Sequence, residues 1–151
     1  MVFIDSNIPM YVAGRDHPLR EPARRFLHAV SGGRVDACTS TEVLQEILYR
    51  YSSLKRLDLA REVYDLFVQI CPSVFPVTLA DTDRARDLLL QHPGAGARDA
   101  IHVAVMLNND VGRIASFDAG FDTFPGIERL TMEQVACAGD MCVTVPKART
   151  R

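Results

Sequence analysis

The sequence lacks several features that would place it in a specialised class of protein. It has only four cysteines, widely scattered, and no C-x-x-C pair. This pattern argues against a zinc site or a disulfide framework. No apolar run approaches the roughly 18 residues that a transmembrane helix needs, so we expect no membrane partner. The N-terminus also lacks the basic stretch, apolar core and small-residue cleavage site of a secretory signal, which favours a cytoplasmic protein.

A large excess of charge of one sign is also absent. The formal net charge is −2, so the molecule as a whole is not an electrostatic trap for nucleic acid. Lysine is scarce: of the 17 basic residues, only Lys55 and Lys147 are lysines. The remaining basic residues are arginines, which bind phosphate through two parallel hydrogen bonds, although genomic base composition also explains such a bias. Cys137 and Cys142 are the one close cysteine pair, and a reducing cytoplasm disfavours a disulfide between them.

The chain nevertheless has enough apolar residues to form one substantial domain. It has 151 residues, of which 48% are hydrophobic. Apolar periodicity and turn residues predict short strands alternating with amphipathic helices, which indicates an α/β fold with a mainly parallel central sheet. The expected strands cover 2–5, 35–38, 74–77 and 113–117, with a weaker one from Leu130; the expected helices cover 21–31, 41–51, 57–70, 78–91 and 98–110. Residues 118–127 read as a turn-rich loop, and 137–151 as a tail without periodicity.

Four acids lie at positions that a parallel sheet would bring close together. Asp5 ends the first strand, Glu46 lies on the helix after "TSTEVLQ", Asp99 opens the helix "DAIHVAVM", and Asp118 follows the strand "RIASF". Ligands of such sheets bind at the carboxyl ends of the strands. Converging carboxylates repel one another, and Mg²⁺ or Mn²⁺, which prefer oxygen ligands, would remove that repulsion. A site of this kind can activate water against a phosphodiester.

Each acid taken singly has a simpler interpretation. Asp99 is equally consistent with a helix N-cap, and Glu46 with an ordinary i,i+4 ion pair to Arg50. Asp118 precedes Ala-Gly and suits a turn. His102 lies on nearly the same helix face as Asp99, and we interpret it as a core or supporting residue rather than a catalytic base.

Taken together, these segments resemble a known family. "FIDSN", "TSTEVLQEIL", "ARDAIHVAVML" and "IASFDAGFD" are similar, in order and spacing, to the four motifs of PIN-domain proteins, and specifically of VapC-type toxin ribonucleases of bacterial toxin–antitoxin pairs. The resemblance runs from about residue 2 to 133. It implies a PIN-like three-layer α/β/α sandwich for residues 1–136, while residues 137–151 form a C-terminal tail without a family counterpart.

The resemblance also implies a site and partners. The catalytic residues would be Asp5, Glu46, Asp99 and Asp118, of which Asp5, Asp99 and Asp118 would hold Mg²⁺ or Mn²⁺. Ser6, Asn7 and Ser116 would be supporting polar residues, and Asp122 would either bind metal through water or brace the loop. An RNA substrate, a cognate antitoxin and a homodimer follow from the same resemblance.

Two questions stay open from sequence alone. Glu42 and Glu46 lie one helical turn apart, and the family's usual spacing of six residues from the polar residue that ends the strand selects Glu46, counted from Ser40. The function also has alternatives: a PIN-like module that binds without catalysing, or a phosphatase of haloacid-dehalogenase type. The phosphatase would need an aspartate two residues after Asp5, where this chain has Asn7.

Overall fold

The computed structural model describes residues 1–137. Of the predicted tail 137–151, only Cys137 is described, and it ends a helix. The rest of that tail and the relation of Cys142 to Cys137 lie outside the described residues. Within residues 1–137, no helix combines the length and the apolar character needed to cross a membrane.

The centre of the fold is a five-stranded sheet in which every pair of neighbouring strands is parallel. Its order is β3-β2-β1-β4-β5. The strands are β1 (Val2–Ile4), β2 (Ala37–Ser40), β3 (Ser73–Phe75), β4 (Arg113–Ala115) and β5 (Glu128–Arg129). This confirms the predicted α/β class with a parallel sheet, and β3, which ends just before Pro76, is at the edge of the sheet as a proline-flanked strand should be.

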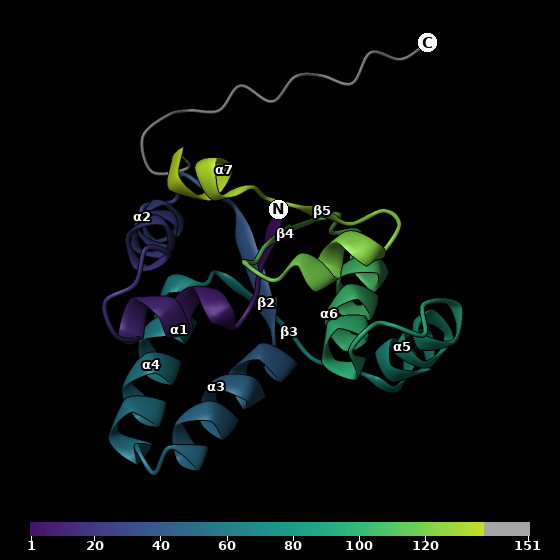
Figure 1. Ribbon diagram of the computed structural model, residues 1–151, viewed down its shortest axis with the longest axis horizontal. Helices are drawn as coiled ribbons and strands as arrows, with labels where there is room; N and C mark the ends of the chain where they lie inside the picture. Colours follow the sequence, from purple (N-terminus) through teal and green to yellow (C-terminus); the bar gives the residue numbers. More distant parts are fainter. Residues whose placement is uncertain (138–151) are drawn as a thin grey trace.

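Helices cover both faces of the sheet and complete a three-layer α/β/α sandwich. They are α1 (Asn7–Ala13), α2 (Arg20–Ser31), α3 (Thr41–Ser53), α4 (Leu57–Ile70), α5 (Leu79–Gln91), α6 (Ala97–Asn108), the 3₁₀ helix η1 (Ala119–Thr123) and α7 (Met132–Cys137). Figure 1 shows α1, α2 and α4 on one side of the sheet and α5 and α6 on the other. Right-handed crossovers explain this division, because the chain moves outward from β1 to β3 and then returns to β4 beyond β1.

The central strand is buried on both faces. Val2, Phe3 and Ile4 of β1 all lie in the core, as continuous apolar strands do when helices cover both sides of a sheet. Because β1 is only three residues long, Asp5 leaves the sheet while it is still buried. Asp5 therefore lies at the carboxyl end of the central strand, inside the surrounding helices.

The structure corrects several predicted boundaries and adds two helices. The second strand begins at Ala37 rather than at residue 35, the last strand precedes Leu130, and the loop after Asp118 contains η1. Helices α1 and α7 were not predicted. Each is only six or seven residues long, and such short helices depend on tertiary packing rather than on an intrinsic pattern. Pro9 is tolerated in α1 because N–H groups of a first helical turn have no intrahelical acceptor.

Candidate active site

The candidate site lies where the strand order reverses. From β1 the chain builds β2 and β3 on one side, and it later places β4 and β5 on the other. The carboxyl ends of β1 and β4 therefore flank a crevice, which is the usual ligand position in open parallel sheets. Asp5 follows β1 and Ser116 follows β4. The two are in contact, since Ser116 Oγ donates a hydrogen bond to Asp5 Oδ2 at 2.6 Å.

Asp5 is held by hydrogen bonds on both carboxylate oxygens. Oδ1 accepts from the Ser6 backbone N–H at 2.7 Å, and Oδ2 accepts from Asn7 Nδ2 at 2.7 Å as well as from Ser116. Asn7 Nδ2 also lies 2.9 Å from Ser116 Oγ, and its Oδ1 accepts from the Phe117 N–H at 3.3 Å. Burial raises the pKa of Asp5, and the positive charge of His102 and these hydrogen bonds only partly offset it.

Glu46 is aimed at Asp5 from the second turn of α3. The helix starts directly after β2 because the Ser40 hydroxyl caps it, accepting from the Val43 N–H at 3.5 Å. Ser6 Oγ donates to Glu46 Oε2 at 2.6 Å, and His102 Nε2 donates to Glu46 Oε1 at 2.7 Å. Burial raises the pKa of Glu46, but the hydrogen bonds and charges around it outweigh burial and leave the pKa lowered. Glu46 is thus kept as a carboxylate.

Of the two glutamates on α3, only Glu46 takes part in these contacts. Glu42 is a first-turn acid on the same helix. The alternative in which Glu46 forms a surface ion pair with Arg50 is not what the structure shows, because the Glu46 side chain is only 11% exposed and faces His102.

His102 is a buried support for Glu46. Its side chain is 1% exposed, and its ring lies beside Phe3, with centroids 5.6 Å apart. Burial lowers the pKa of His102, but the hydrogen bond to Glu46 and the charge of Asp5 outweigh burial and raise it. Within residues 1–137, Nδ1 has no hydrogen-bond partner. The hydrogen bond from Nε2 thus fixes the position of the Glu46 carboxylate.

Asp99 and Asp118 form the outer part of the cluster. Asp99 is half-buried in the first turn of α6, and Asp118 is exposed at the start of η1, where its Oδ1 accepts from the Gly120 N–H at 2.8 Å. A methyl group placed on Gly120 would lie 3.1 Å from Asp118 Oδ1 and 3.3 Å from Asp99 Oδ2. The two carboxylates thus converge on the same point. The N-cap position of α6 belongs to Gly96, so Asp99 is not the cap.

Electrostatics joins all four acids into one cluster. Burial raises the pKa of Asp99, and the negative charges of Asp118, Asp5 and Glu46 raise it further, while His102 acts in the opposite direction. A carboxylate whose neighbours repel its charge is best neutralised by a cation. The predicted acids are therefore brought together in space from four separate elements.

The donor set suits a hard divalent cation, which prefers several oxygens. Ligand atoms of Asp5, Glu46 and His102 all lie within 4.8 Å of one another. However, His102 donates to Glu46, so this trio is a hydrogen-bonded network rather than a complete ligand set. No hydrogen bond to an Asp99 carboxylate oxygen occurs within the described residues, which leaves those oxygens available to an ion.

Asp122 has a different environment. Its two carboxylate oxygens accept from Arg129 Nε at 2.9 Å and from Arg129 Nη2 at 2.7 Å. These paired hydrogen bonds connect η1 to β5 and hold the pKa of Asp122 below its usual range. Of the two roles considered for Asp122, this contact matches bracing of the loop.

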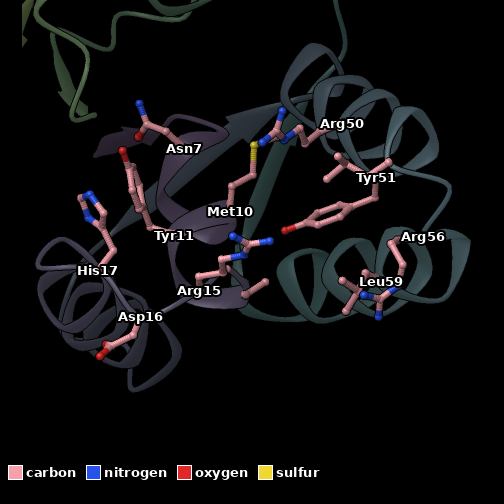
Figure 2. Close-up of a pocket in the computed structure, with 13 residues that line it drawn as sticks. Asn7, Met10, Tyr11, Arg15, Asp16, His17, Arg50, Tyr51, Arg56 and Leu59 are labelled. Carbon is pink, nitrogen blue, oxygen red and sulfur yellow. The ribbon is translucent and has the colours of Figure 1, made fainter.

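A groove of about 1160 Å³ opens beside the site. Its walls are α1, the loop 14–17, the second half of α3 and the start of α4, and Asn7 connects it to the carboxylates. Figure 2 shows Arg15 and Tyr51 pointing toward one another across it, with Tyr11 and Arg50 on its walls. No local pattern in the sequence predicted this groove. The one indication in the sequence was Arg50, which lies one helical turn after Glu46 and lines the groove.

Comparison with known proteins agrees with this geometry. The PIN domain family model matches residues 2–127. Ribonuclease VapC13 of Mycobacterium tuberculosis is 43% identical over 130 residues, which are 86% of this chain and 99% of that protein. Ribonuclease VapC23 of the same species is 42% identical over 118 residues, covering 78% of this chain and 93% of the relative.

Solved structures share the fold. Mycobacterium tuberculosis VapC20, described as a Sarcin-Ricin loop cleaving toxin, superposes with a TM-score of 0.68 at 18% identity, covering 84% of this chain and 98% of that one. VapBC2 from Rickettsia felis, bound to a DNA fragment from its promoter, gives the same TM-score and identity over 86% and 98% of the two chains. The motifs, the carboxylate cluster and these relatives lead to one conclusion: the chain belongs to the PIN-domain family, as a toxin of the VapC type.

Proposed function

We propose that this chain is a metal-dependent endoribonuclease that acts in the cytoplasm as the toxin of a toxin–antitoxin pair. The observation that carries the proposal is the convergence of Asp5, Glu46, Asp99 and Asp118 on one crevice, with the pKa of Asp99 raised by its neighbours. The ribonuclease names of the relatives at 43% and 42% identity support the same activity. The homodimer implied by the resemblance stays a prediction.

The residues divide the chemistry between them. Asp5, Asp99 and Asp118 would hold one or two Mg²⁺ or Mn²⁺ ions, which supply Lewis acidity at the phosphate when bound. Glu46, kept ionised by Ser6 and His102, is placed to orient the attacking water and accept its proton. Water then adds to phosphorus in line, and the bond to the leaving oxygen breaks, giving a phosphate monoester and a free hydroxyl.

The alternatives have less support. The haloacid-dehalogenase reading needs a second aspartate at position 7, whereas Asn7 uses its amide to hold Asp5 and Ser116. A module that binds without catalysing would not require Glu46 and His102 to be buried as a hydrogen-bonded pair. Burying such a pair costs desolvation free energy, which is offset only when good geometry and further hydrogen bonds, here from Ser6, hold the charged groups.

Metal should both stabilise the protein and switch on RNA cleavage. At a Mn²⁺ concentration tenfold above the dissociation constant, binding to the native state should add about 1.4 kcal/mol, or a few degrees in Tm. The measurements are a melting series and degradation of total cellular RNA, each with Mg²⁺, with Mn²⁺ and with chelator. A protein that melts identically at millimolar Mn²⁺ and leaves RNA intact would contradict the proposal, while a shift without cleavage would favour the binding module.

We also propose that a segment of the antitoxin occupies the groove beside Asn7. Solved neighbours include a toxin–antitoxin complex from Klebsiella pneumoniae, at 15% identity and a TM-score of 0.61. The groove combines apolar walls with Arg15 and Arg50, and no ion pair of either arginine is found among residues 1–137. This chemistry suits a partner segment that alternates apolar and acidic side chains, and it would reach the carboxylates through Asn7.

The partner proposal predicts that charge reversal in the groove weakens the complex. The protein would be co-expressed with the product of its neighbouring reading frame and the complex isolated. Arg50→Glu should reduce co-purification at least about tenfold, the size of a lost charge-assisted contact plus repulsion. Arg61→Glu is the control, because Arg61 lies on α4, is exposed and does not line the groove. Equal recovery of the two variants would place the partner elsewhere.

A further inference from the structure

One arginine next to the carboxylate cluster, Arg98, is not used by the mechanism above. Arg98 precedes Asp99 in the first turn of α6 and is exposed. Its guanidinium carbon lies 5.5 Å from the centroid of the Tyr49 ring. Tyr49 belongs to α3, one helical turn after Glu46, and is itself 56% exposed. The pair therefore joins the two helices that supply Glu46 and Asp99, at the mouth of the site.

Arg98 is available to a ligand. No hydrogen bond or ion pair of its guanidinium is found in the described part of the chain. Arg129 also acts on the cluster, through the charge of Asp118, but two hydrogen bonds to Asp122 already occupy it. Arg98, in contrast, stacks over the Tyr49 ring. An aromatic face orients a guanidinium while leaving its N–H groups free for a ligand.

The negative charge of the site explains why a positive side chain beside it would help RNA to bind. RNA is a polyanion, and the site that must receive it contains four carboxylates. A divalent cation would neutralise the phosphate that reacts, but the flanking phosphates of the strand would still meet a negative rim. The positive charge of Arg98 reaches the site, since it helps to keep Glu46 ionised. A flanking phosphate bound at Arg98 would thus be attracted where the carboxylates alone would repel it.

We propose that Arg98 binds a backbone phosphate of the RNA strand next to the scissile bond, and that the Tyr49 ring positions its guanidinium. This rests on the proposed ribonuclease function and adds a substrate contact to it. The contact is sequence-independent, because phosphates are common to every RNA. Arg98 would therefore affect how tightly RNA binds much more than how fast the bound strand is cleaved.

Steady-state cleavage of an RNA fragment that the wild type cuts is the first arm of the test. Arg98→Ala should raise KM about tenfold with kcat changed little, the expected size of one exposed charge-assisted hydrogen bond. Tyr49→Leu should raise KM by a smaller factor, and Tyr49→Phe, which keeps the ring, should recover most of that loss. Arg61→Ala is the control, because Arg61 lies on α4, is 88% exposed and pairs with Asp65.

Binding without cleavage is the second arm, and it separates this inference from the proposed function. Affinity for a short fluorescent single-stranded RNA is measured against salt concentration in an Asp99→Asn background. Adding Arg98→Ala should reduce the slope of log affinity against log salt by roughly 0.7, the value for one phosphate contact on a single strand. Arg98→Lys, which keeps the charge, should retain the slope.

The outcomes are distinct. An unchanged KM and an unchanged salt slope in Arg98→Ala would overturn the phosphate contact while leaving the nuclease intact. A fall in kcat at constant KM would likewise overturn it and show that Arg98 acts on the reaction instead. If the wild type cleaves no RNA, the proposed function fails, and the salt slope still decides whether Arg98 contacts RNA.

Discussion

Replacing Asp99 with asparagine should abolish RNA cleavage while making the metal-free protein more stable. Asp99 has no hydrogen bond to its carboxylate within residues 1–137, and it is repelled by Asp118, Asp5 and Glu46. Asparagine has the same shape without the charge. Loss of supporting residues around metal ligands typically costs 10–100-fold, so loss of a ligand should reduce kcat by at least about a hundredfold. Cleavage assays and melting curves on the same preparation measure both effects.

The stability gain should depend on pH in a defined direction. The pKa of Asp99 is raised in the folded protein above its ordinary value of 3.8, so the folded state binds more protons than the unfolded state between these values. The stability of the metal-free wild type therefore falls as pH rises through this window. Asp99→Asn removes that contribution, so its advantage in melting temperature should grow from acidic to neutral pH.

Asp5→Asn is the matched comparison for this prediction. The pKa of Asp5 is raised as well, but its oxygens accept from Ser6, Asn7 and Ser116. An amide group would turn an N–H toward those donors, which leaves buried polar groups unsatisfied and costs about 1–3 kcal/mol. Asp5→Asn should therefore lower the melting temperature where Asp99→Asn raises it. An active Asp99→Asn enzyme, or equal destabilisation by both variants, would contradict the assignment of Asp99.

Glu46→Gln should be far more damaging than Glu42→Gln. A group that orients water and accepts its proton contributes roughly 10²–10⁴-fold to a rate, and kcat should fall by that factor. The glutamine amide also cannot satisfy both Ser6 and His102 as the carboxylate does. We therefore expect a loss of stability of about 1–3 kcal/mol.

Glu42→Gln is the internal control for that experiment, because it makes the same chemical change one turn earlier on α3. Its kcat should stay within a factor of about three of wild type, because substitutions outside a buried hydrogen-bond network usually have small effects. Parallel single-turnover measurements at saturating Mn²⁺ compare the two variants directly. A dead Glu42→Gln enzyme beside an active Glu46→Gln enzyme would mean that the catalytic glutamate is one helical turn earlier.

Much of the fold could be predicted because its signals are local. The apolar run before Asp5 defines a short buried strand, and Ser40 caps the helix that carries Glu46. The helices 57–70 and 79–91 follow apolar periodicity and agree with the prediction nearly to the residue. Helix α1 could not be predicted in the same way, because seven residues with a proline contain too few turns for a period to appear.

The sequence by itself determined that Asp5 and Asp118, which follow strands, reach the crevice. An acid that follows a strand of a parallel sheet must lie at its carboxyl end, whatever its partners are. Only the tertiary structure decided what each acid does there. Ser6 is at the N-cap position of α1, but its hydroxyl donates to Glu46, 40 residues away, instead of capping its own helix. Asn7 connects Asp5 to Ser116 across 109 residues. Such contacts depend on which strands and helices become neighbours, and no local pattern contains that information.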